Sequence, residues 1–383
     1  MVVEDVAVLI VGGGPSGLAT AACLTNHSIP YVILEREDCN ASLWRKHTYD
    51  SLKLHTPKEA SALPLHPISD ESPTYIPKAA FIDYIDAYVA RFDIRPRCNR
   101  NVTKAEFDRE LGKWRVEAAV GEGGVEVYVA RFLVVASGEN DVENVPEIEG
   151  LARFKGRVVH SRQYKNGVEY EGKRVLVVGA GNSGMEIAYD LSVSGARASV
   201  VVRSPIHILT KEMLMWGLKS YLTGVYTRPV VDIALMFMSR LKIGDLSRYG
   251  IRRPPKGPIQ NRLATGRGSV LDVGTVAKIH SGDIKVFPAI EKICDNTVTF
   301  SDGSEQEFDA IILATGYKSG APGWLKDYHS ILNGDGTLKK KSPEQHWKGE
   351  DGVYCAGLVK QALYGCANDA QLIAGDIHMT LNK

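Results

Sequence analysis

The sequence predicts an α/β protein with two similar domains, one of them inserted into the other. Two observations favour this fold class. A glycine-rich strand–turn–helix pattern occurs twice, at residues 6–35 and 174–203. The 383 residues also exceed the roughly 250–300 residues at which single hydrophobic cores stop growing. Two domains with substantial cores are therefore expected.

The composition excludes several classes of protein. Hydrophobic residues make up 44% and charged residues 24%, which is typical of a globular protein. The net charge of +1 gives no reason to expect a nucleic-acid or membrane-surface partner through bulk electrostatics, although local basic sites remain open. Six cysteines without C-x-x-C or metal-ligand spacing predict no metal site and a reducing compartment.

No stretch of the sequence has the pattern of a membrane segment or a signal peptide. The apolar run 6–11 lacks a basic region before it and continues into glycines, and the run 230–238 is shorter than the ~20 residues of a span and contains Asp232. We therefore expect a cytoplasmic protein without a membrane span. The oligomeric state stays open.

The first glycine pattern begins with a buried strand at 6–11. It continues through Gly12, Gly14 and Gly17 into a helical Ala/Leu stretch, and a second strand at 31–34 ends at Glu35. Glycines permit a tight turn and close backbone approach, and the helix start presents free N–H groups to a phosphate. This context predicts a Rossmann-like dinucleotide-binding unit.

The second pattern repeats the first. Its glycines are Gly179, Gly181 and Gly184, and its second strand, 199–202, ends at Arg203. Asn182 and Ser183 stand at the predicted helix start, where they could contact a pyrophosphate or simply cap the helix.

The two patterns differ in the charge that follows the second strand. Glu35 can accept hydrogen bonds from a ribose hydroxyl but would repel a 2′-phosphate, which Arg203 would bind through its planar guanidinium. The first site should thus hold FAD or NAD and the second NADP. Either residue could instead be a solvated charge at a strand end. The basic segment 251–258 could add cations at the second site or be a plain basic loop.

The remaining patterns suggest the domain boundaries. A helical stripe from Phe81 to Phe92 predicts core packing, and hairpin patterns at 113–135 and 297–317 flank the second glycine unit. We therefore expect a discontinuous FAD-binding domain at 1–150 and 275–383, a linker at 151–164 and an NADP-binding domain at 165–270.

Several motifs together resemble the class B flavin-dependent monooxygenases, and within them the plant YUCCA-type enzymes of auxin biosynthesis. The pattern F-x-G-x-x-x-H-x-x-x-Y occurs at Phe154, Gly156, His160 and Tyr164. The segments SLWRK at 42–46, ASGEN at 136–140, DVGT at 272–275, LATGY at 313–317 and GVYCAG at 352–357 look like further landmarks. The resemblance covers nearly the whole chain.

This resemblance implies FAD at the first site and NADPH at the second. Reduced flavin would react with dioxygen to a C4a-(hydro)peroxyflavin, which would convert indole-3-pyruvate to indole-3-acetate. Trp44, Arg45 and Gly357 would join the FAD site. His160 in the linker is expected to be a structural hydrogen-bonding residue.

Three residues are candidates for the reaction centre. Asn140 would support the peroxide by hydrogen bonding, His55 would shape oxygen handling and Lys360 would bind the substrate carboxylate. Asn140 could also be an ordinary turn residue, and Lys360 a plain surface lysine.

Departures from the family pattern leave other functions open. Leu358, Gln361 and Ala362 replace an aromatic, a basic residue and a glycine, so a changed substrate is one alternative. The others are oxygenation of a soft nitrogen or sulfur and a flavin-binding regulator without turnover. A dithiol–disulfide oxidoreductase would need a close cysteine pair, which the sequence lacks.

Overall fold

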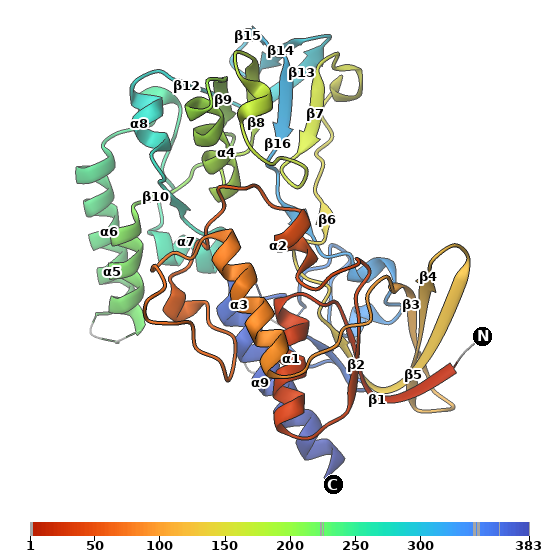
Figure 1. Ribbon diagram of the computed structural model, residues 1–383. Coiled ribbons are helices and arrows are strands. Elements are labelled where there is room, and N and C mark those ends of the chain that lie inside the picture. The colour runs from red at the N-terminus through yellow and green to blue at the C-terminus, as the bar shows by residue number, and fades with distance from the viewer. Residues whose placement is uncertain are drawn as a thin grey trace. The chain divides into compact units, whose positions relative to one another are not determined.

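The computed structural model describes residues 3–222, 224, 226–339, 342, 345–359 and 361–382, which form two compact units (Figure 1). The first unit comprises Met1–His47, Thr56–Glu143 and Gly316–Lys383, and the second comprises Thr48–His55 and Asn144–Thr315. The chain therefore leaves the first unit twice, once for a short segment and once for most of the second unit.

The first unit is built on a six-stranded mixed sheet with the order β2-β1-β5-β4-β3, to which β18 adds beside β5. The strands β2, β1, β5 and β18 are parallel, whereas β5, β4 and β3 form an antiparallel meander. Consecutive residues Val8, Leu9 and Ile10 are buried, as expected for a strand covered on both faces. The strands are β1 (Val3–Val11), β2 (Tyr31–Leu34), β3 (Asn101–Asp108), β4 (Lys113–Val120), β5 (Gly124–Val135) and β18 (Val353–Cys355).

Helices α1 (Pro15–Asn26) and α9 (Ala362–Leu381) pack side by side in this unit (Figure 1). The predicted core stripe of α3 (Lys78–Arg91) is confirmed, since Phe81, Ile85 and Tyr88 are buried. The other elements are α2 (Ser42–Lys46), the 3₁₀ helices η1 (Lys58–Ala60), η5 (Ala321–Gly323) and η6 (Tyr328–Ser330), and the ribbon of β6 (Val142–Glu143) with β17 (Tyr317–Lys318).

The second unit repeats this architecture. Its five-stranded sheet is parallel throughout, with the order β12-β9-β8-β16-β7, and a separate antiparallel sheet contains β13, β14 and β15. The strands are β7 (Arg157–His160), β8 (Arg174–Val178), β9 (Arg197–Val201), β12 (Ile284–Phe287), β13 (Ile290–Cys294), β14 (Thr297–Phe300), β15 (Glu305–Glu307) and β16 (Ala310–Leu313).

Helices complete the second unit. Helix α4 (Asn182–Val193) follows the second glycine turn, and α5, α6 and α7 form a small helical group beside the paired strands β10 (Ile208–Leu209) and β11 (Val270–Leu271). Their bounds are α5 (Lys211–Leu222), α6 (Arg228–Ile243), α7 (Pro258–Thr265) and α8 (Thr275–His280), with 3₁₀ helices η2 (Leu151–Arg153), η3 (Val168–Tyr170) and η4 (Ser247–Tyr249). Both units are thus α/β units built on parallel strands of the Rossmann type, although the sheet of the first unit also contains the antiparallel strands β4 and β3.

The units differ from the predicted boundaries in one large segment. Residues 275–315, which we expected in the first domain, belong to the second unit. The reason is strand pairing: β16 lies inside the second sheet between β8 and the edge strand β7, and β12 forms the opposite edge. The hairpin pattern preceding Leu313 therefore completes the second unit instead of returning to the first.

The prediction of a linker at 151–164 was also wrong. Strand β7 pairs with β16 in parallel, Phe154 belongs to the hydrophobic core, and a Cβ on Gly156 would lie 2.4 Å from the carbonyl oxygen of Asp309. The hydroxyl of buried Tyr164 donates to Asp190 on α4, 2.5 Å away, and burial raises the pKa of this phenol. The motif residues therefore form an edge strand and packing contacts inside the second unit.

His160 is buried in this strand end. Its Nδ1 accepts a hydrogen bond from the backbone N–H of Arg162, and its own backbone N–H donates to Gln163 Oε1, 2.7 Å away. These contacts support the expected structural role.

No helix in the described part of the chain is long and apolar enough to cross a membrane. Among the same residues, no group of three or more His, Cys, Asp or Glu side chains could hold a metal ion.

Candidate dinucleotide sites

The first glycine turn connects β1 to α1 and leaves open space at Gly14. Gly12 has a φ of +114°, and a Cβ there would lie 2.4 Å from the carbonyl oxygen of Ala136. A Cβ on Gly17 would lie 2.0 Å from the carbonyl oxygen of Gly12. Apart from its immediate chain neighbours, no described atom lies within 4 Å of a Cβ built on Gly14. The outer glycines are thus required by the turn itself, while the middle one faces space that a ligand can enter.

Helix α1 begins at this open space. Gly14 is the N-cap, Pro15 is the first helical residue, and no side chain among the described residues caps the turn. The first N–H groups of the helix lack intrahelical acceptors and carry about half a positive charge. This arrangement fits a pyrophosphate.

Gly357 reaches the start of α1 from the far end of the sequence. It has a φ of +75°, and a Cβ there would lie 2.1 Å from Ser16 Oγ. Its N–H donates to Asp369 Oδ2, 2.9 Å away, and Asp369 is also hydrogen-bonded to buried His346. Close packing with Ser16 therefore requires glycine at this predicted site position. Ser16, inside the first glycine pattern, is a further candidate site residue that the sequence reasoning did not name.

Glu35 is buried beside the glycine turn. Its Oε2 accepts the N–H of Gly13 at 2.7 Å, and its Oε1 accepts the N–H of Glu37 at 3.0 Å and the hydroxyl of Ser42 at 3.3 Å. A carboxylate has about four acceptor positions, so roughly one remains for a ribose hydroxyl. A buried carboxylate at this place also disfavours a 2′-phosphate.

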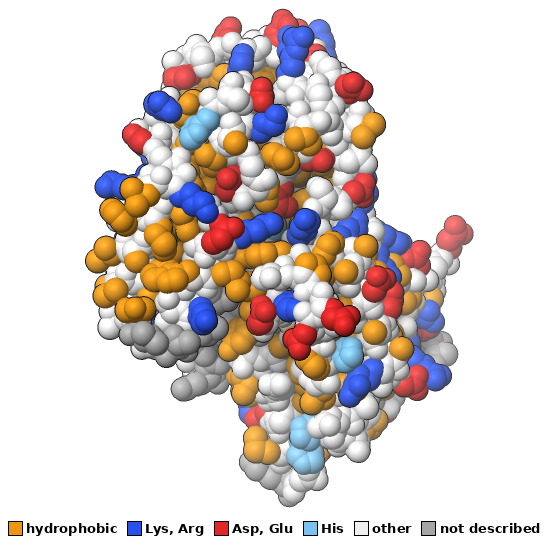
Figure 2. All heavy atoms as spheres, turned by 60° about the vertical axis from the view of Figure 1, so that its left-hand side comes forward, with side chains coloured by type: hydrophobic (Ala, Val, Ile, Leu, Met, Phe, Trp, Pro, Cys, Tyr) orange, Lys and Arg blue, Asp and Glu red, His pale blue; other side chains and the backbone are white. Residues whose placement is uncertain are grey.

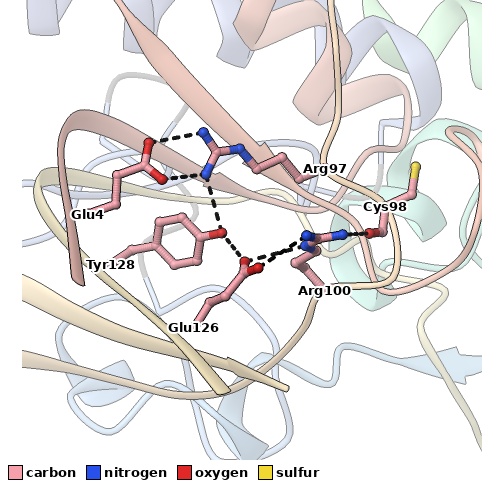
Figure 3. Close-up of polar contacts among 6 residues, drawn as sticks. All are labelled: Glu4, Arg97, Cys98, Arg100, Glu126 and Tyr128. Atoms are coloured by element: carbon pink, nitrogen blue, oxygen red, sulfur yellow. Dashed lines mark hydrogen bonds and ion pairs between the residues drawn. The ribbon is translucent and has the colours of Figure 1, made fainter. Parts of the chain in front are cut away.

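The segment 97–100 lies alongside Glu35. The N–H of Glu35 donates to the carbonyl oxygen of Arg97, and the N–H of Arg100 donates to that of Glu35, at 2.9 and 2.8 Å. Figure 3 shows that both guanidinium groups are engaged elsewhere: Arg97 binds Glu4 in a bidentate pair, and Arg100 binds Glu126. The hydrogen bond from Arg97 holds the pKa of Glu4 below its usual value. Both guanidinium groups are therefore paired with carboxylates other than Glu35.

Helix α2 follows the first turn closely, because the N–H of Ala41 donates to the carbonyl oxygen of Gly13 at 2.9 Å. Trp44 packs its ring 4.5 Å from that of Phe81. Arg45 donates to the backbone and side-chain oxygens of Asn40 and pairs with Asp86. The two predicted flavin-contacting residues are therefore held on a short helix attached to the turn.

The segment after β5 contacts the glycine turn through Ala136. Ser137 Oγ is buried without a hydrogen-bond partner among the described residues, and Gly138 has a φ of +89°. Asn140 is exposed at the end of this loop. Lys360, the third catalytic candidate, lies outside the described residues.

The second glycine turn has the same geometry as the first. Gly179 has a φ of +113°, and its Cβ would lie 2.4 Å from the carbonyl oxygen of Ala314. A Cβ on Gly184 would lie 1.9 Å from the carbonyl oxygen of Gly179, whereas one on Gly181 would meet no described atom within 4 Å. Helix α4 starts here, again without a side-chain cap in the described chain. The second turn thus fits a pyrophosphate for the same reason.

The polar residues at this turn differ in their availability. Asn182 Oδ1 accepts the N–H of Leu271 at 2.8 Å and so holds β11, while Ser183 is half-buried at the helix start. Arg203, two residues beyond β9, is exposed, and no carboxylate in the described part of the chain pairs with it. An unpaired guanidinium at this position fits a 2′-phosphate.

The basic segment 251–258 lies next to the chain that follows Arg203. The N–H of Ile206 donates to the carbonyl oxygen of Arg252 at 2.9 Å. Arg253 donates to the carbonyl oxygen of Gly244 at 2.5 Å, so it caps the end of α6. Arg252 and Lys256 remain exposed.

His55 lies in the second unit, where it joins a buried carboxylate. Glu186, two residues after Gly184, accepts the hydroxyl of Tyr49 at 2.6 Å and is hydrogen-bonded to His55 Nε2 at 2.9 Å. The sequence reasoning missed Glu186, although its place in the second glycine pattern was visible. Asn140 lies in the first unit, so the structure places these two catalytic candidates in different units.

Comparisons with known proteins agree with this architecture. A family model described as flavin-binding monooxygenase-like matches residues 5–361. The chain is 48% identical to the probable indole-3-pyruvate monooxygenase YUCCA10 of Arabidopsis thaliana, over 98% of either protein. It is also 48% identical to the indole-3-pyruvate monooxygenase YUCCA6 of the same plant, over 97% of this chain and 89% of the relative. A flavin-containing monooxygenase from Stenotrophomonas maltophilia has a similar fold, with a TM-score of 0.74, 21% identity and 99% coverage of both chains.

Proposed function

The chain belongs to the flavin-binding monooxygenase-like family, and from this premise we propose that it converts indole-3-pyruvate to indole-3-acetate, the plant hormone auxin. It is an FAD-dependent monooxygenase that acts on a small molecule and uses NADPH. The observation that carries the substrate assignment is the 48% identity, over nearly the full length of both chains, to relatives named for this reaction.

The overall reaction balances with these reactants. NADPH and a proton supply two reducing equivalents, one atom of dioxygen enters the new carboxyl group, and the other leaves as water. The former carboxylate of the keto acid leaves as carbon dioxide. When bound, FAD would accept electrons from NADPH and react with dioxygen. No amino-acid side chain provides this redox chemistry.

The first unit is proposed to bind FAD. Gly12, Gly14 and Gly17 would let the pyrophosphate approach the start of α1, and the remaining acceptor position of Glu35 would take a ribose hydroxyl. Gly357 would keep the approach to α1 clear of a side chain. Trp44 and Arg45 would contribute from α2, where Asn40 and Asp86 already orient the guanidinium.

The second unit is proposed to bind NADPH. Gly179, Gly181 and Gly184 would form the pyrophosphate turn, and Arg203 would bind the 2′-phosphate. Ser183 would contact the pyrophosphate with its hydroxyl. Asn182 would contribute its backbone N–H or its Nδ2 group, because its Oδ1 already accepts a hydrogen bond.

Asn140, His55 and Lys360 are proposed to act at the reaction centre. The exposed amide of Asn140 can donate and accept hydrogen bonds, and Glu186 fixes which edge of the His55 imidazole is available. Lys360 would pair with the substrate carboxylate. If Asn140 supports oxygen transfer, Asn140→Ala should divert NADPH consumption toward hydrogen peroxide while FAD stays bound; an unchanged product yield per NADPH would remove this role.

The protein is further proposed to act in the cytoplasm. All six cysteines are free thiols in the structure, which suits a reducing compartment.

The experiment that tests the proposal is aerobic incubation of the purified protein with NADPH and indole-3-pyruvate under ¹⁸O₂. We expect indole-3-acetate carrying a single ¹⁸O atom, in proportion to the NADPH consumed. Parallel reactions with phenylpyruvate and with an amine and a thioether test the alternatives. Faster oxygenation of the amine or thioether would replace the keto-acid assignment with heteroatom oxygenation, and FAD binding without any NADPH turnover would indicate a regulator.

A further inference from the structure

Helix α6 carries large apolar side chains on the face that points to solvent. Val230, Ile233, Phe237 and Leu241 are 49%, 68%, 61% and 72% exposed. Their spacing of three, four and four residues places them in one line along the helix. A surface helix of a globular protein ordinarily keeps such a stripe for its core-facing side.

The opposite face of α6 packs against the core of the second unit. Val231 and Leu235 are buried against Leu209 and Met213, and Ser239 donates its hydroxyl to the carbonyl oxygen of Ile208 at 3.0 Å. Asp232 is also on the buried side, where its carboxylate accepts the first N–H groups of α7. The exposed stripe therefore does not contribute to the hydrophobic core of the second unit.

Further apolar side chains are exposed just before α6 and on the neighbouring helix α7, and we call the whole set the α6 patch. It consists of the exposed residues Tyr226, Val230, Ile233, Phe237, Leu241 and Leu263. Figure 2 shows hydrophobic side chains gathered over this helical group, with lysine and arginine side chains around them. A clustered apolar surface of this kind marks an interaction site, whereas isolated exposed apolar residues do not.

The net charge of the segment that contains α5, α6 and α7 indicates which kind of partner the patch fits. Residues 211–267 contain eleven Lys and Arg against three Asp and Glu, a net charge of +8 in a chain whose total is +1. Of the three acids, Asp232 is buried, and Glu212 is paired with Lys242. The surface of α5 to α7 is thus apolar at its centre and strongly cationic around it.

Two of the common partners fit this surface poorly. A second copy of the chain, docked through the same patch, would bring two cationic regions of +8 together, which is electrostatically unfavourable. A nucleic acid would engage the cations but leave the apolar stripe without a counterpart. An anionic lipid surface fits both the apolar stripe and the surrounding cations. Its acyl chains can contact the apolar side chains, and its anionic headgroups can pair with the lysine and arginine side chains.

We propose that the α6 patch is a docking surface for an anionic lipid bilayer. Helix α6 lies in the interface with Ile233, Phe237 and Leu241 inserted among the acyl chains, and exposed Arg228 and Arg240 reach the headgroup phosphates. This peripheral mode needs no spanning helix. It would bring the enzyme to a surface where apolar substrates concentrate, and it is independent of which substrate the enzyme oxygenates.

The test is vesicle flotation of the full-length, FAD-loaded protein. Vesicles of phosphatidylcholine with 30% phosphatidylserine are compared with vesicles of phosphatidylcholine alone, at low salt and at high salt. We expect flotation with the anionic vesicles that weakens at high salt, and at least about tenfold less binding to neutral vesicles.

The matched variants separate the α6 patch from general hydrophobicity. The triple variant Ile233→Ser, Phe237→Ser, Leu241→Ser should lose binding to anionic vesicles about tenfold or more. The control triple Leu111→Ser, Val125→Ser, Met379→Ser removes comparably exposed residues of the first unit and should bind like the parent protein. NADPH oxidation and FAD content of both triples serve as checks of folding, because none of these residues belongs to a proposed cofactor site.

Three results would overturn the proposal. The first is equal flotation of the parent protein and the α6 triple variant. The second is binding that does not depend on phosphatidylserine. The third is a dimer of the parent protein in light scattering that the α6 triple variant converts to a monomer, which would assign the patch to a second copy of the chain.

Discussion

Replacing Arg203 with alanine should separate the two nicotinamide cofactors. Arg203 is exposed beyond β9 and unpaired among the described residues, so its loss leaves no buried carboxylate uncompensated and should not unfold the second unit. The side chain would contribute only to a ligand that carries a 2′-phosphate. NADH lacks this group and should be unaffected.

The expected rise in the KM for NADPH follows from the solvent exposure of the Arg203 side chain. Hydrogen bonds to charged groups contribute about 1.5–3 kcal/mol, and solvent screening places an exposed guanidinium in the lower half of this range. Since about 1.4 kcal/mol corresponds to a factor of ten, the KM for NADPH should rise roughly tenfold to fortyfold. Arg203→Lys should recover part of the loss, because a lysine keeps the charge but not the bidentate geometry.

The assay is the initial rate of NADPH and NADH oxidation at several concentrations, at fixed ionic strength. Arg197→Ala is the matched control, since Arg197 is an exposed arginine at the opposite end of the same strand. Equal rises in the KM for NADPH and NADH, or a rise for NADPH in the Arg197 variant as well, would refute the assignment of Arg203 to the 2′-phosphate.

Three further predictions concern the second unit. Gly184→Ala should abolish NADPH binding and destabilise the unit, because its Cβ would lie 1.9 Å from the carbonyl oxygen of Gly179. Gly181→Ala should fold normally and only weaken NADPH binding in a fluorescence titration, because its Cβ would point into open space. Tyr164→Phe should lower the free energy of unfolding by about 1–3 kcal/mol in urea melts, because it removes the hydroxyl donor from the half-buried carboxylate of Asp190. A change below about 0.5 kcal/mol would contradict this reading. The hydrogen bond from Arg174 lowers the pKa of Asp309 below its usual value, so their pair stabilises the fold above the ordinary aspartate pKa of about 4 and this stabilisation is lost as the pH falls through the lowered pKa. Arg174→Met should therefore flatten the acid limb of the stability curve, and an unchanged limb would exclude a contribution of the pair.

The glycine turns and the charges after their second strands could be predicted because the evidence for them is local. A φ near +114° at Gly12 and Gly179 requires glycine. Gly17 and Gly184 each follow a helix N-cap glycine by three residues, about one helical turn. Glu35 follows β2 directly, and Arg203 stands two residues beyond the last residue of β9, so both lie within two residues of a strand whose hydrophobic pattern is visible. These features need no knowledge of distant contacts.

The tertiary structure changed the assignments that depend on strand order. The hairpin patterns at 113–135 and 297–317 look alike, and only the pairing of β16 between β8 and β7 assigns the second one to the second unit. The sequence around Phe154 and Tyr164 also has the pattern of a connector. The pairing of β7 with β16 shows that it belongs to the second sheet. Sheet neighbours are chosen by contacts across the fold, which periodicity along the chain does not encode.

By itself the sequence determined that this chain has two dinucleotide turns with opposite charges beside them, because backbone conformation and helix starts are set within a few residues. Only the tertiary structure decided which polar groups remain available for a ligand. It engages Asn182 Oδ1 with Leu271, joins His55 to Glu186 and leaves the stripe of α6 facing solvent. The physical reason is that burial and hydrogen-bond partners arise where segments far apart in the sequence meet.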